Sequence, residues 1–380
     1  MKTVYLHVGA PKTGTTTLQY FMYENRQILE EKSICYPDLQ FKFPGIADNR
    51  NAHFLIQRVY DNNKKRIYEK EREIIETGFQ KINECLEKHN TIILSEESIW
   101  NEREMNIKKF GKIRQELSAM NAELKVIVYL RRQDLLMPSY WAQLVKSRLT
   151  LSFEEFISSG AYKRYRVDYA KRLDEISRAV GKENIIVRAY EKQQFEGNNH
   201  TLISDFLNLF GIELTEEFKI SDGMRNTRLN KKSLELKRIL NKNEIFQEKK
   251  SFIVPILEDI QSENDLDTQP MKEYYFSYEE QDSFLKLFDE TNSIVAKEYM
   301  NREDGILFKD KILTKDQSVT TYSYEDLILL CGDIILKQEE ENQELHMKIK
   351  DANILIKNLK NNVSIPRKVY RKIKTIIKKI

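Results

Sequence analysis

The stretch "HVGAPKTGTTTLQYF", residues 7–21, decides the fold. An apolar run leads into a glycine-containing turn, and a helical pattern follows, which predicts a strand, a tight loop and a helix. Gly9 and Gly14 have the spacing of the nucleotide-triphosphate loop G-x-x-x-x-G-K-[ST]. Thr15 stands where that loop has its lysine, however, and Lys12 lies inside the loop instead. The loop therefore predicts an anion site of a different kind.

Further strand-like runs alternate with helical patterns as far as residue 190. Near-continuous apolar strands separated by helices are typical of a parallel sheet covered on both faces. We expect an α/β protein with a P-loop-like three-layer fold, a central parallel sheet and a C-terminal helical extension. The expected strands are residues 3–8, 91–95, 125–130 and 184–190. The expected helices are residues 15–31, 67–88, 106–120, 134–146 and 168–180, the last ended by Gly181.

Composition restricts the class of protein. The chain has 380 residues, of which 41% are hydrophobic, and a net charge of +3, which gives no general case for nucleic-acid binding. The cysteines, Cys35, Cys85 and Cys331, have no metal-binding spacing and cannot all pair, which favours reduced thiols in the cytoplasm. No stretch has the pattern of a signal peptide or a membrane span.

The C-terminal part differs in character from the rest. After residue 240 the pattern is helical, apart from a polar stretch near residues 261–270 that we expect to be turn-rich. From residue 331 apolar residues recur at alternating steps of four and three, which predicts a long helix able to self-associate as a coiled coil. The basic amphipathic end is typical of a helix that binds an anionic membrane surface. We expect a domain over residues 1–310, a helical extension over 311–363 and a basic tail over 364–380.

The loop after the first strand is suited to phosphate or sulfate. Its backbone N–H groups and the positive end of the following helix converge on one point. Gly14 lets the backbone approach the ligand, and Thr15, Thr16 and Thr17 add hydroxyl donors. Lys12 lies on the outer arc of the loop, nearer a bond being broken than a terminal phosphate.

The sequence "PKTGTT", residues 11–16, resembles the 5′-phosphosulfate loop, P-K-[ST]-G-[ST]-[ST], of sulfotransferases that use 3′-phosphoadenosine-5′-phosphosulfate (PAPS). The resemblance implies PAPS as co-substrate and no metal. It implies that Lys12 neutralises the bridging oxygen between the 5′-phosphate and the departing sulfuryl group. The loop residues implied to bind the cofactor are Pro11, Lys12, Thr13, Gly14, Thr15, Thr16 and Thr17.

PAPS has a separate 3′-phosphate, so a second basic site is required. Arg131 follows the strand at residues 125–130, and Ser139 lies eight residues further on, in the expected helix. The sulfotransferase family has an arginine and a serine at this spacing, and both bind the 3′-phosphate. Arg131 offers a planar fork of donors to phosphate oxygens. Arg132 is a second cation that can contact the ligand or pair with Asp134.

The acceptor must lose a proton, which requires a base. Glu96 and Glu97 end the strand at residues 91–95, and because adjacent strand residues point to opposite faces, at most one should enter the site. Glu97 aligns with a glutamate of bacterial sulfotransferase-like sequences, so we prefer Glu97 as the base and then Glu96. His53 is the rival, since other branches of the family use histidine.

The resemblance extends over about residues 1–310. It implies that Tyr190 contacts adenine, and it leaves Arg225 and Arg228 either at the nucleotide or on the surface. The R-K-G-x-x-G motif of the cytosolic animal enzymes is absent from the sequence, so the chain resembles a bacterial or glycan-directed branch. That branch implies a carbohydrate or glycolipid acceptor, which a cytoplasmic enzyme peripheral to the inner membrane face could reach.

Two other functions remain open. A nucleotide kinase or ATPase would need a lysine after Gly14, which is missing, and a magnesium carboxylate, for which Glu96 or Glu97 could serve. A non-enzymatic scaffold would use the helical extension and basic tail and keep only a vestigial nucleotide site. Nucleotide binding that depends on magnesium would indicate the kinase or ATPase instead of the sulfotransferase. Absence of bisphosphate binding would indicate the scaffold.

Overall fold

The computed structural model of the chain describes residues 2–220, 229–267 and 273–362. The chain divides into two compact units. The first unit comprises Met1–Trp141, Phe153–Asn226 and Tyr274–Val319. The second comprises Ala142–Ser152, Thr227–Glu273 and Thr320–Ile380.

The first unit is built on a five-stranded parallel sheet of order β2-β3-β1-β4-β5. The expected α/β fold with a central parallel sheet is therefore confirmed. Because β1 lies between β3 and β4, the chain changes direction across the sheet at β1, and ligands bind at such points beyond the carboxyl ends of the strands. The strands are β1 (Lys2–His7), β2 (Ile34–Cys35), β3 (Thr91–Ser95), β4 (Ala122–Leu130) and β5 (Ile185–Ala189).

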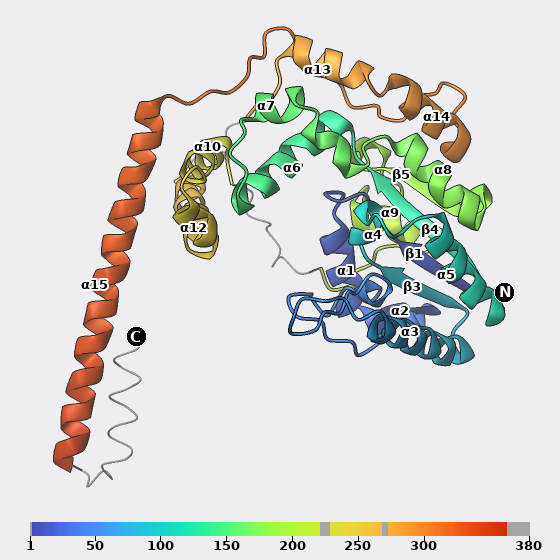
Figure 1. The fold of residues 1–380 in the computed structure, drawn as a ribbon, viewed down its shortest axis with the longest axis horizontal. Helices are drawn as coiled ribbons and strands as arrows, with labels where there is room; N and C mark the ends of the chain where they lie inside the picture. Colours follow the sequence, from blue (N-terminus) through green and yellow to red (C-terminus); the bar gives the residue numbers. More distant parts are fainter. Residues whose placement is uncertain (1, 221–228, 268–272, 363–380) are drawn as a thin grey trace. The chain divides into compact units, whose positions relative to one another are not determined.

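Helices cover both faces of this sheet (Figure 1). On one face, Leu18 and Phe21 from α1 (Thr15–Glu24) and Phe206 from α9 (Leu202–Asn208) form one core with Ile127 of β4. On the other face, α5 (Ile107–Ala119) and α8 (Tyr169–Val180) pack on each other and on β4. Burial on both faces explains why the strands are almost continuously apolar.

The remaining elements of the first unit connect these layers, and a helical group makes up the second unit, in which α15 packs on α10 and α12. The other α-helices of the first unit are α2 (Arg26–Glu31), α3 (Tyr68–Lys88), α4 (Ser98–Asn101), α7 (Phe153–Ser158), α13 (Tyr278–Lys286) and α14 (Asp289–Met300). Its 3₁₀-helices are η1 (His53–Leu55), η2 (Ala161–Tyr165), η3 (Lys182–Asn184) and η4 (Lys192–Gln194). The division between the units falls within α6 (Gln133–Ser147). The second unit contains α10 (Lys231–Leu240), α11 (Glu244–Glu248), α12 (Lys250–Asp267) and α15 (Tyr324–Asn362).

The helix expected over residues 15–31 is two helices, separated at Asn25. The buried Asn25 amide donates to the carbonyls of Phe21 and Lys219, both at 2.8 Å, and its oxygen accepts the Lys219 N–H at 2.7 Å. A side chain that bonds to the backbone in this way competes with regular helix hydrogen bonding. The expectation of one continuous helix was wrong for this reason.

Two boundaries in the helical part also differ from expectation. The stretch expected to be turn-rich, near residues 261–270, is helical as far as Asp267 within α12. Its polar residues include no glycine, and no proline before Pro270, so nothing in residues 261–267 ends the helix. The helical extension expected over residues 311–363 begins only at Tyr324, and residues 311–323 form no helix. Ser323 caps α15: the Asp326 N–H donates to Ser323 Oγ at 3.1 Å. Among the residues described here, no helix is both long and apolar enough to span a bilayer.

Candidate active site

The loop at residues 8–14 leaves β1 at the carboxyl edge of the sheet. Its first residues still pair with β4, since the Val8 and Ala10 N–H groups donate to Ile127 O and Tyr129 O at 3.1 and 2.9 Å. The backbone then turns through the left-handed region at Lys12, where φ is 69°. The Thr13 hydroxyl donates to Ala10 O at 2.5 Å and closes the turn. Lys12 is consequently exposed on the outer arc, as the sequence predicts.

Gly14 ends the loop and caps α1. Its φ of 76° lies in the left-handed region, where a glycine is favoured. A Cβ there would lie 2.3 Å from Leu202 Cδ2 and 3.4 Å from Tyr190 Cε2, so a side chain would have to displace Leu202. No side chain caps α1, which leaves its first N–H groups available to a ligand at the positive end of the helix. This is the geometry of an anion site.

The threonines that follow Gly14 differ in exposure. Thr15 is buried, Thr16 is half-buried and Thr17 is exposed, while Pro11 is half-buried in the turn. Thr15 Oγ1 has no partner of full hydrogen-bond geometry among the described residues, although it lies close enough to Glu97 to affect that carboxyl's pKa. A buried hydroxyl without a partner is costly. An anion bound in the loop would offer this hydroxyl an acceptor of better geometry than Glu97 does.

Arg131 joins the loop to β4. Its Nη1 donates to Lys12 O at 3.1 Å and lies 3.4 Å from Ser139 Oγ. Its guanidinium carbon is 5.8 Å from the centre of the Tyr190 ring, which follows β5. The Tyr169 hydroxyl donates to Arg131 O and fixes the backbone there. The structure thus brings together Lys12, Arg131, Ser139 and Tyr190, which the sequence predicts as binding residues; their roles stay predictions.

The alternatives for Arg132 are decided by its contacts. Its Nε and Nη2 donate to the two oxygens of Asp134 at 2.7 and 2.9 Å, and both side chains are buried. Its Nη1 donates to Asp310 O. Of the two roles left open by the sequence, the ion pair with Asp134 is therefore the one observed.

Glu96 lies in a charge-balanced cluster. Its buried carboxylate accepts hydrogen bonds from Arg50 (Nε at 3.1 Å, and Nη2), from His53 Nδ1 at 2.9 Å and from Ser98 N at 2.9 Å. Burial alone would raise the pKa of Glu96, but the hydrogen bonds from His53 and Arg50 outweigh it and lower that pKa. The other ring nitrogen of His53 is 3.1 Å from Gln57 Oε1. Glu96 and His53 thus hold each other in place.

Glu97 has a different environment. β3 ends at Ser95, so Glu96 and Glu97 follow the strand and are not its last residues, contrary to the expectation. Glu97 is the N-cap of α4. Burial raises the pKa of the Glu97 carboxyl, and the positive charges of Lys12 and Arg50 offset this only in part. A buried carboxyl with a raised pKa that is influenced by the loop lysine is a candidate for a general base.

The sequence did not single out Arg50 or Tyr140. Arg50 balances Glu96, and nothing in the residues around it indicates a partner 46 positions away. The Tyr140 hydroxyl accepts from Asn101 Nδ2 at 3.0 Å, and its ring stacks on Tyr165 at 4.3 Å between centroids. Burial raises the pKa of Tyr140, and the negative charge of Glu97 adds to the effect. Its position next to Ser139 was the available signal.

The contacts described above do not test two predictions, the roles of Arg225 and Arg228 and the absence of a metal. Arg225 and Arg228 lie outside the described residues. In the parts of the chain that are described, no group of three or more His, Cys, Asp or Glu side chains is arranged to hold a metal ion.

Comparisons with known proteins give distant matches. No protein-family model matches the chain. An uncharacterized protein of Archaeoglobus fulgidus is 29% identical over 240 residues, which are 62% of this chain and 60% of that protein. The chain thus aligns with about 60% of that relative's length. The crystal structure of a sulfotransferase from Alicyclobacillus acidocaldarius aligns with 65% of this chain and 96% of its own, at 14% identity and a TM-score of 0.35. Similarity this low carries no argument about activity.

Proposed function

We propose that this chain is a sulfotransferase that moves the sulfuryl group of PAPS to a hydroxyl or amine of an acceptor. One observation carries the proposal. A lysine-bearing loop after β1 and an arginine–serine pair after β4 meet at one edge of the sheet, with Arg131 Nη1 3.1 Å from Lys12 O and 3.4 Å from Ser139 Oγ. This arrangement offers two adjacent anion sites, which suits a ligand with a 5′-phosphosulfate and a 3′-phosphate.

The residues of the loop fit the 5′ end of such a ligand. When bound, PAPS supplies the sulfuryl group and a bisphosphate leaving group. The uncapped N–H groups at the start of α1 and the Thr15 hydroxyl would hold the anionic oxygens. The exposed Lys12 would stabilise negative charge as it develops on the leaving oxygen, an effect confined to the transition state.

The residues after β4 and β5 fit the nucleoside end. Arg131 and Ser139 would donate to the 3′-phosphate, and the forked guanidinium favours bidentate contact. Tyr190, whose ring is near both Arg131 and Gly14, would stack on the adenine. A ring that is packed in place presents a stacking surface at little entropic cost.

Glu97 is the base in this proposal. It has a raised pKa and lies under the influence of Lys12, whereas Glu96 is occupied by Arg50 and His53. His53 is a poorer candidate because both ring nitrogens have partners. Glu97 would accept the acceptor's proton as the acceptor oxygen or nitrogen attacks sulfur, opposite the leaving bisphosphate.

Calorimetric titration with adenosine 3′,5′-bisphosphate in EDTA tests the donor site. Tight binding that is stronger than binding of 5′-AMP and is lost in Arg131→Ala supports the proposal. An exposed cation elsewhere, Lys112→Ala on α5, is the matched control and should bind as the native chain does. Preference for ATP with magnesium would replace the proposal with a kinase or ATPase, and no binding of either nucleotide would leave a scaffold.

The acceptor is proposed on family resemblance alone to be a carbohydrate or glycolipid. Incubation with PAPS carrying radioactive sulfur, and with a panel of oligosaccharides, glycolipids, phenols and peptides, tests this class. Label transferred to sugars in the native chain and not in Glu97→Gln supports it. Transfer to phenols alone would retain the sulfotransferase and exclude the glycan.

Self-association and membrane contact are further parts of the proposal. Ile328, Leu329, Ile335 and Leu336 on α15 are each about two-thirds exposed, which supports pairing of this helix with a second copy. Sedimentation of the native chain and of a Leu329→Gln/Leu336→Gln variant tests the pairing, and a monomer in both cases would exclude it.

The basic tail at residues 364–380 lies outside the described residues. Peripheral membrane contact through it, in a cytoplasmic protein, is tested with vesicles of anionic phospholipid. Equal co-sedimentation of the full chain and a chain ending at Asn362 would exclude it.

A further inference from the structure

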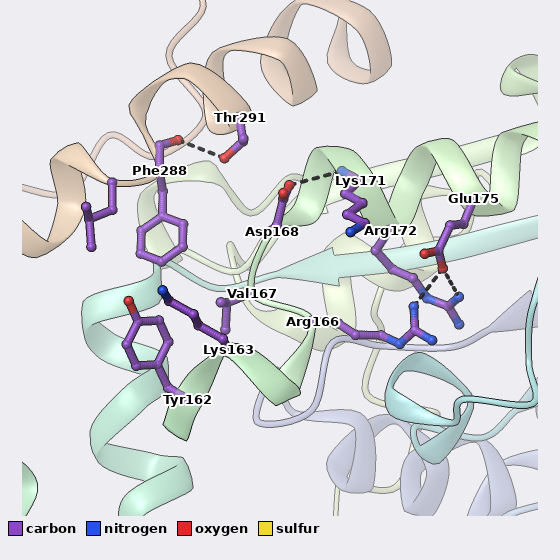
Figure 2. A pocket seen from close by; sticks show the side chains of 11 residues that line it. Tyr162, Lys163, Arg166, Val167, Asp168, Lys171, Arg172, Glu175, Phe288 and Thr291 are labelled. Atoms are coloured by element: carbon purple, nitrogen blue, oxygen red, sulfur yellow. Dashed lines mark hydrogen bonds and ion pairs between the residues drawn. The ribbon is translucent and has the colours of Figure 1, made fainter. Parts of the chain in front are cut away.

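A pocket of about 580 Å³ lies in the first unit, and the residues that line it do not include the loop at residues 8–14. It is enclosed by the segment around η2, by α8 and by the junction of α13 and α14. Figure 2 shows the Tyr162 and Phe288 rings at one side of it and Arg166, Arg172 and Glu175 at the other. This volume is in the usual range for sites that bind small molecules.

The aromatic side of the pocket is preformed. Tyr162 and Phe288 are both almost fully buried. The Phe284 ring lies behind them, 5.3 Å from the centre of each ring. Leu287, which is 63% exposed, extends this apolar wall to the rim. Rings fixed in this way offer an apolar ligand a surface that needs no rearrangement.

The polar side carries more positive than negative charge. Glu175 is shared by two guanidinium groups, Arg166 at 2.6 Å and Arg172 at 2.9 Å. The other acid, Asp168, accepts the Lys171 N–H at 3.1 Å as the cap of α8. The ammonium groups of Lys163 and Lys171 make no ion pair with any described residue. Both acids are engaged by hydrogen bonds within the protein, and the side chains that line the pocket keep a net positive charge.

The positive charge of the Arg172 guanidinium is only partly balanced by the groups around it. It is 1% exposed, and its Nε has no hydrogen-bond partner within the described part of the chain. Burial, and then the like charge of Arg166, lower the pKa of Arg172 to about 10, which Glu175 only partly opposes. An additional negative charge in the pocket would stabilise this cluster.

Arg172 also connects the pocket to the segment that carries Glu97. It donates to Ile99 O at 3.0 Å and to Met105 O at 2.9 Å, on either side of the end of α4. Because Arg172 itself lines the pocket, a ligand there would lie one side chain from that segment.

We propose that this pocket is a second ligand site, for a small organic anion that carries an aromatic or aliphatic group. The anionic group would meet Lys163, Lys171 and Arg166, and the apolar group would pack on Tyr162 and Phe288. The charged side alone would bind any anion, and the aromatic side alone would bind any apolar molecule. Selectivity therefore requires a ligand that has both an anionic and an apolar group. The observations that support this site do not depend on the proposed sulfuryl transfer.

Calorimetric titration of the full chain with 1-naphthalenesulfonate tests this site, with 1-naphthol and inorganic sulfate as matched probes that each lack one half of the ligand. We expect the sulfonate to bind more tightly than either. Lys163→Gln and Lys171→Gln should each weaken its binding about two- to fivefold, the worth of one partly exposed ion pair. Lys112→Gln, an exposed lysine on α5 outside the pocket, should leave it unchanged. Thermal melting of each variant confirms an intact fold.

Several results would overturn the proposal. Equal binding of 1-naphthol would mean a merely apolar pocket, and equal binding of sulfate a merely charged surface. No binding of the sulfonate, or binding unaffected by both lysine substitutions, would also exclude the site. Loss of binding in Arg131→Ala would place the probe at the sheet edge instead, whereas retention there keeps this test separate from that of the donor site.

Discussion

The carboxyl edge of the sheet carries two groups of charged side chains that differ in how their charges are balanced. The Glu96 cluster, formed by Glu96, Arg50 and His53, is closed: its central carboxylate is fully buried and accepts hydrogen bonds from both partners. The loop side, formed by Lys12, Thr15, Glu97, Arg131 and Ser139, is open. It includes a carboxyl of raised pKa and a buried hydroxyl without a full hydrogen-bond partner.

This contrast in environment is the reason for proposing a structural role for Glu96 and a functional one for Glu97. A buried charge that is fully hydrogen-bonded is stable in place and has little tendency to exchange a proton. A buried charge with incomplete compensation gains from a ligand or a proton. The loop side therefore has the unsatisfied groups that a substrate can complete, and the Glu96 cluster keeps the segment around them in position.

The largest expected effect is on catalysis in Glu97→Gln. If Glu97 is the base, sulfuryl transfer should fall by about 10²–10⁴-fold. Donor affinity and thermal stability should change little, since the amide keeps the size of the side chain. Transfer of radioactive sulfur from PAPS, measured beside titration with adenosine 3′,5′-bisphosphate, checks both. Near-native transfer in this variant would remove Glu97 from the mechanism and return His53 to consideration.

Lys12→Ala should lower the rate by about 10²–10³-fold, because stabilisation of the leaving oxygen acts mainly in the transition state. Bisphosphate affinity should be nearly retained, in contrast to Arg131→Ala. Single-turnover rates and calorimetry on the two variants give this comparison, with the exposed Lys88→Ala as a control of equal charge change. If Lys12→Ala lowered bisphosphate affinity and the transfer rate by equal factors, the lysine would stabilise the bound ground state as well as the transition state.

Glu96→Gln should affect stability more than chemistry. Removing one partner of a buried ion pair costs about 3–5 kcal/mol, and the amide retains some of the hydrogen bonds, so we expect the lower part of this range. Urea unfolding of this variant beside Glu97→Gln measures the difference. If Glu97→Gln were the more destabilised variant, the result would contradict the assignment of the structural role to the Glu96 cluster.

Gly14→Ala should distort the loop, because a side chain there adopts φ 76° and meets Leu202. A left-handed non-glycine residue costs about 1–2 kcal/mol, before any clash. Gly111→Ala is the matched control: Gly111 lies within α5 with nothing near its added Cβ, so the same change should be neutral or slightly stabilising. Bisphosphate affinity and melting temperature report on both, and equal behaviour of the two variants would contradict a special role for Gly14.

The smallest expected effects concern pH. Because the Glu97 pKa is raised, transfer should increase with pH through a value above the ordinary 4.5 of a glutamate, and the residual rate of Glu97→Gln should lack this acidic limb.

The pH dependence of stability should be opposite for the two carboxyls. The raised pKa of Glu97 favours the fold below its unfolded value, and this contribution is lost as the pH rises through the folded value. The lowered pKa of Glu96 stabilises above its unfolded value, and this is lost as the pH falls through the folded value. Urea unfolding of each glutamine variant across pH 3–7 separates the two contributions.

Much of the fold was predictable because strand and helix periodicity is local. β3 and the helix at α5 lie within a residue or so of the expected bounds. The meeting of Lys12, Arg131 and Ser139 at one edge of the sheet was also predictable, since the carboxyl ends of parallel strands share one edge. The break at Asn25 was missed because its cause is a hydrogen bond to Lys219, far away in the chain.

The sequence by itself determined the loop: the lysine inside it, the glycine at its end and the threonines after it are adjacent residues whose backbone geometry depends on their own side chains. It also predicted that Arg131 and Ser139 lie together, because one follows a strand and the other is eight residues further on, in the next helix. Only the tertiary structure decided which carboxylate is held by the protein and which remains open. The pKa of Glu96 depends on Arg50 and His53, and that of Glu97 on burial and on Lys12. Burial and charge pairing act through space, so two identical neighbouring residues become distinct only when the chain has folded around them.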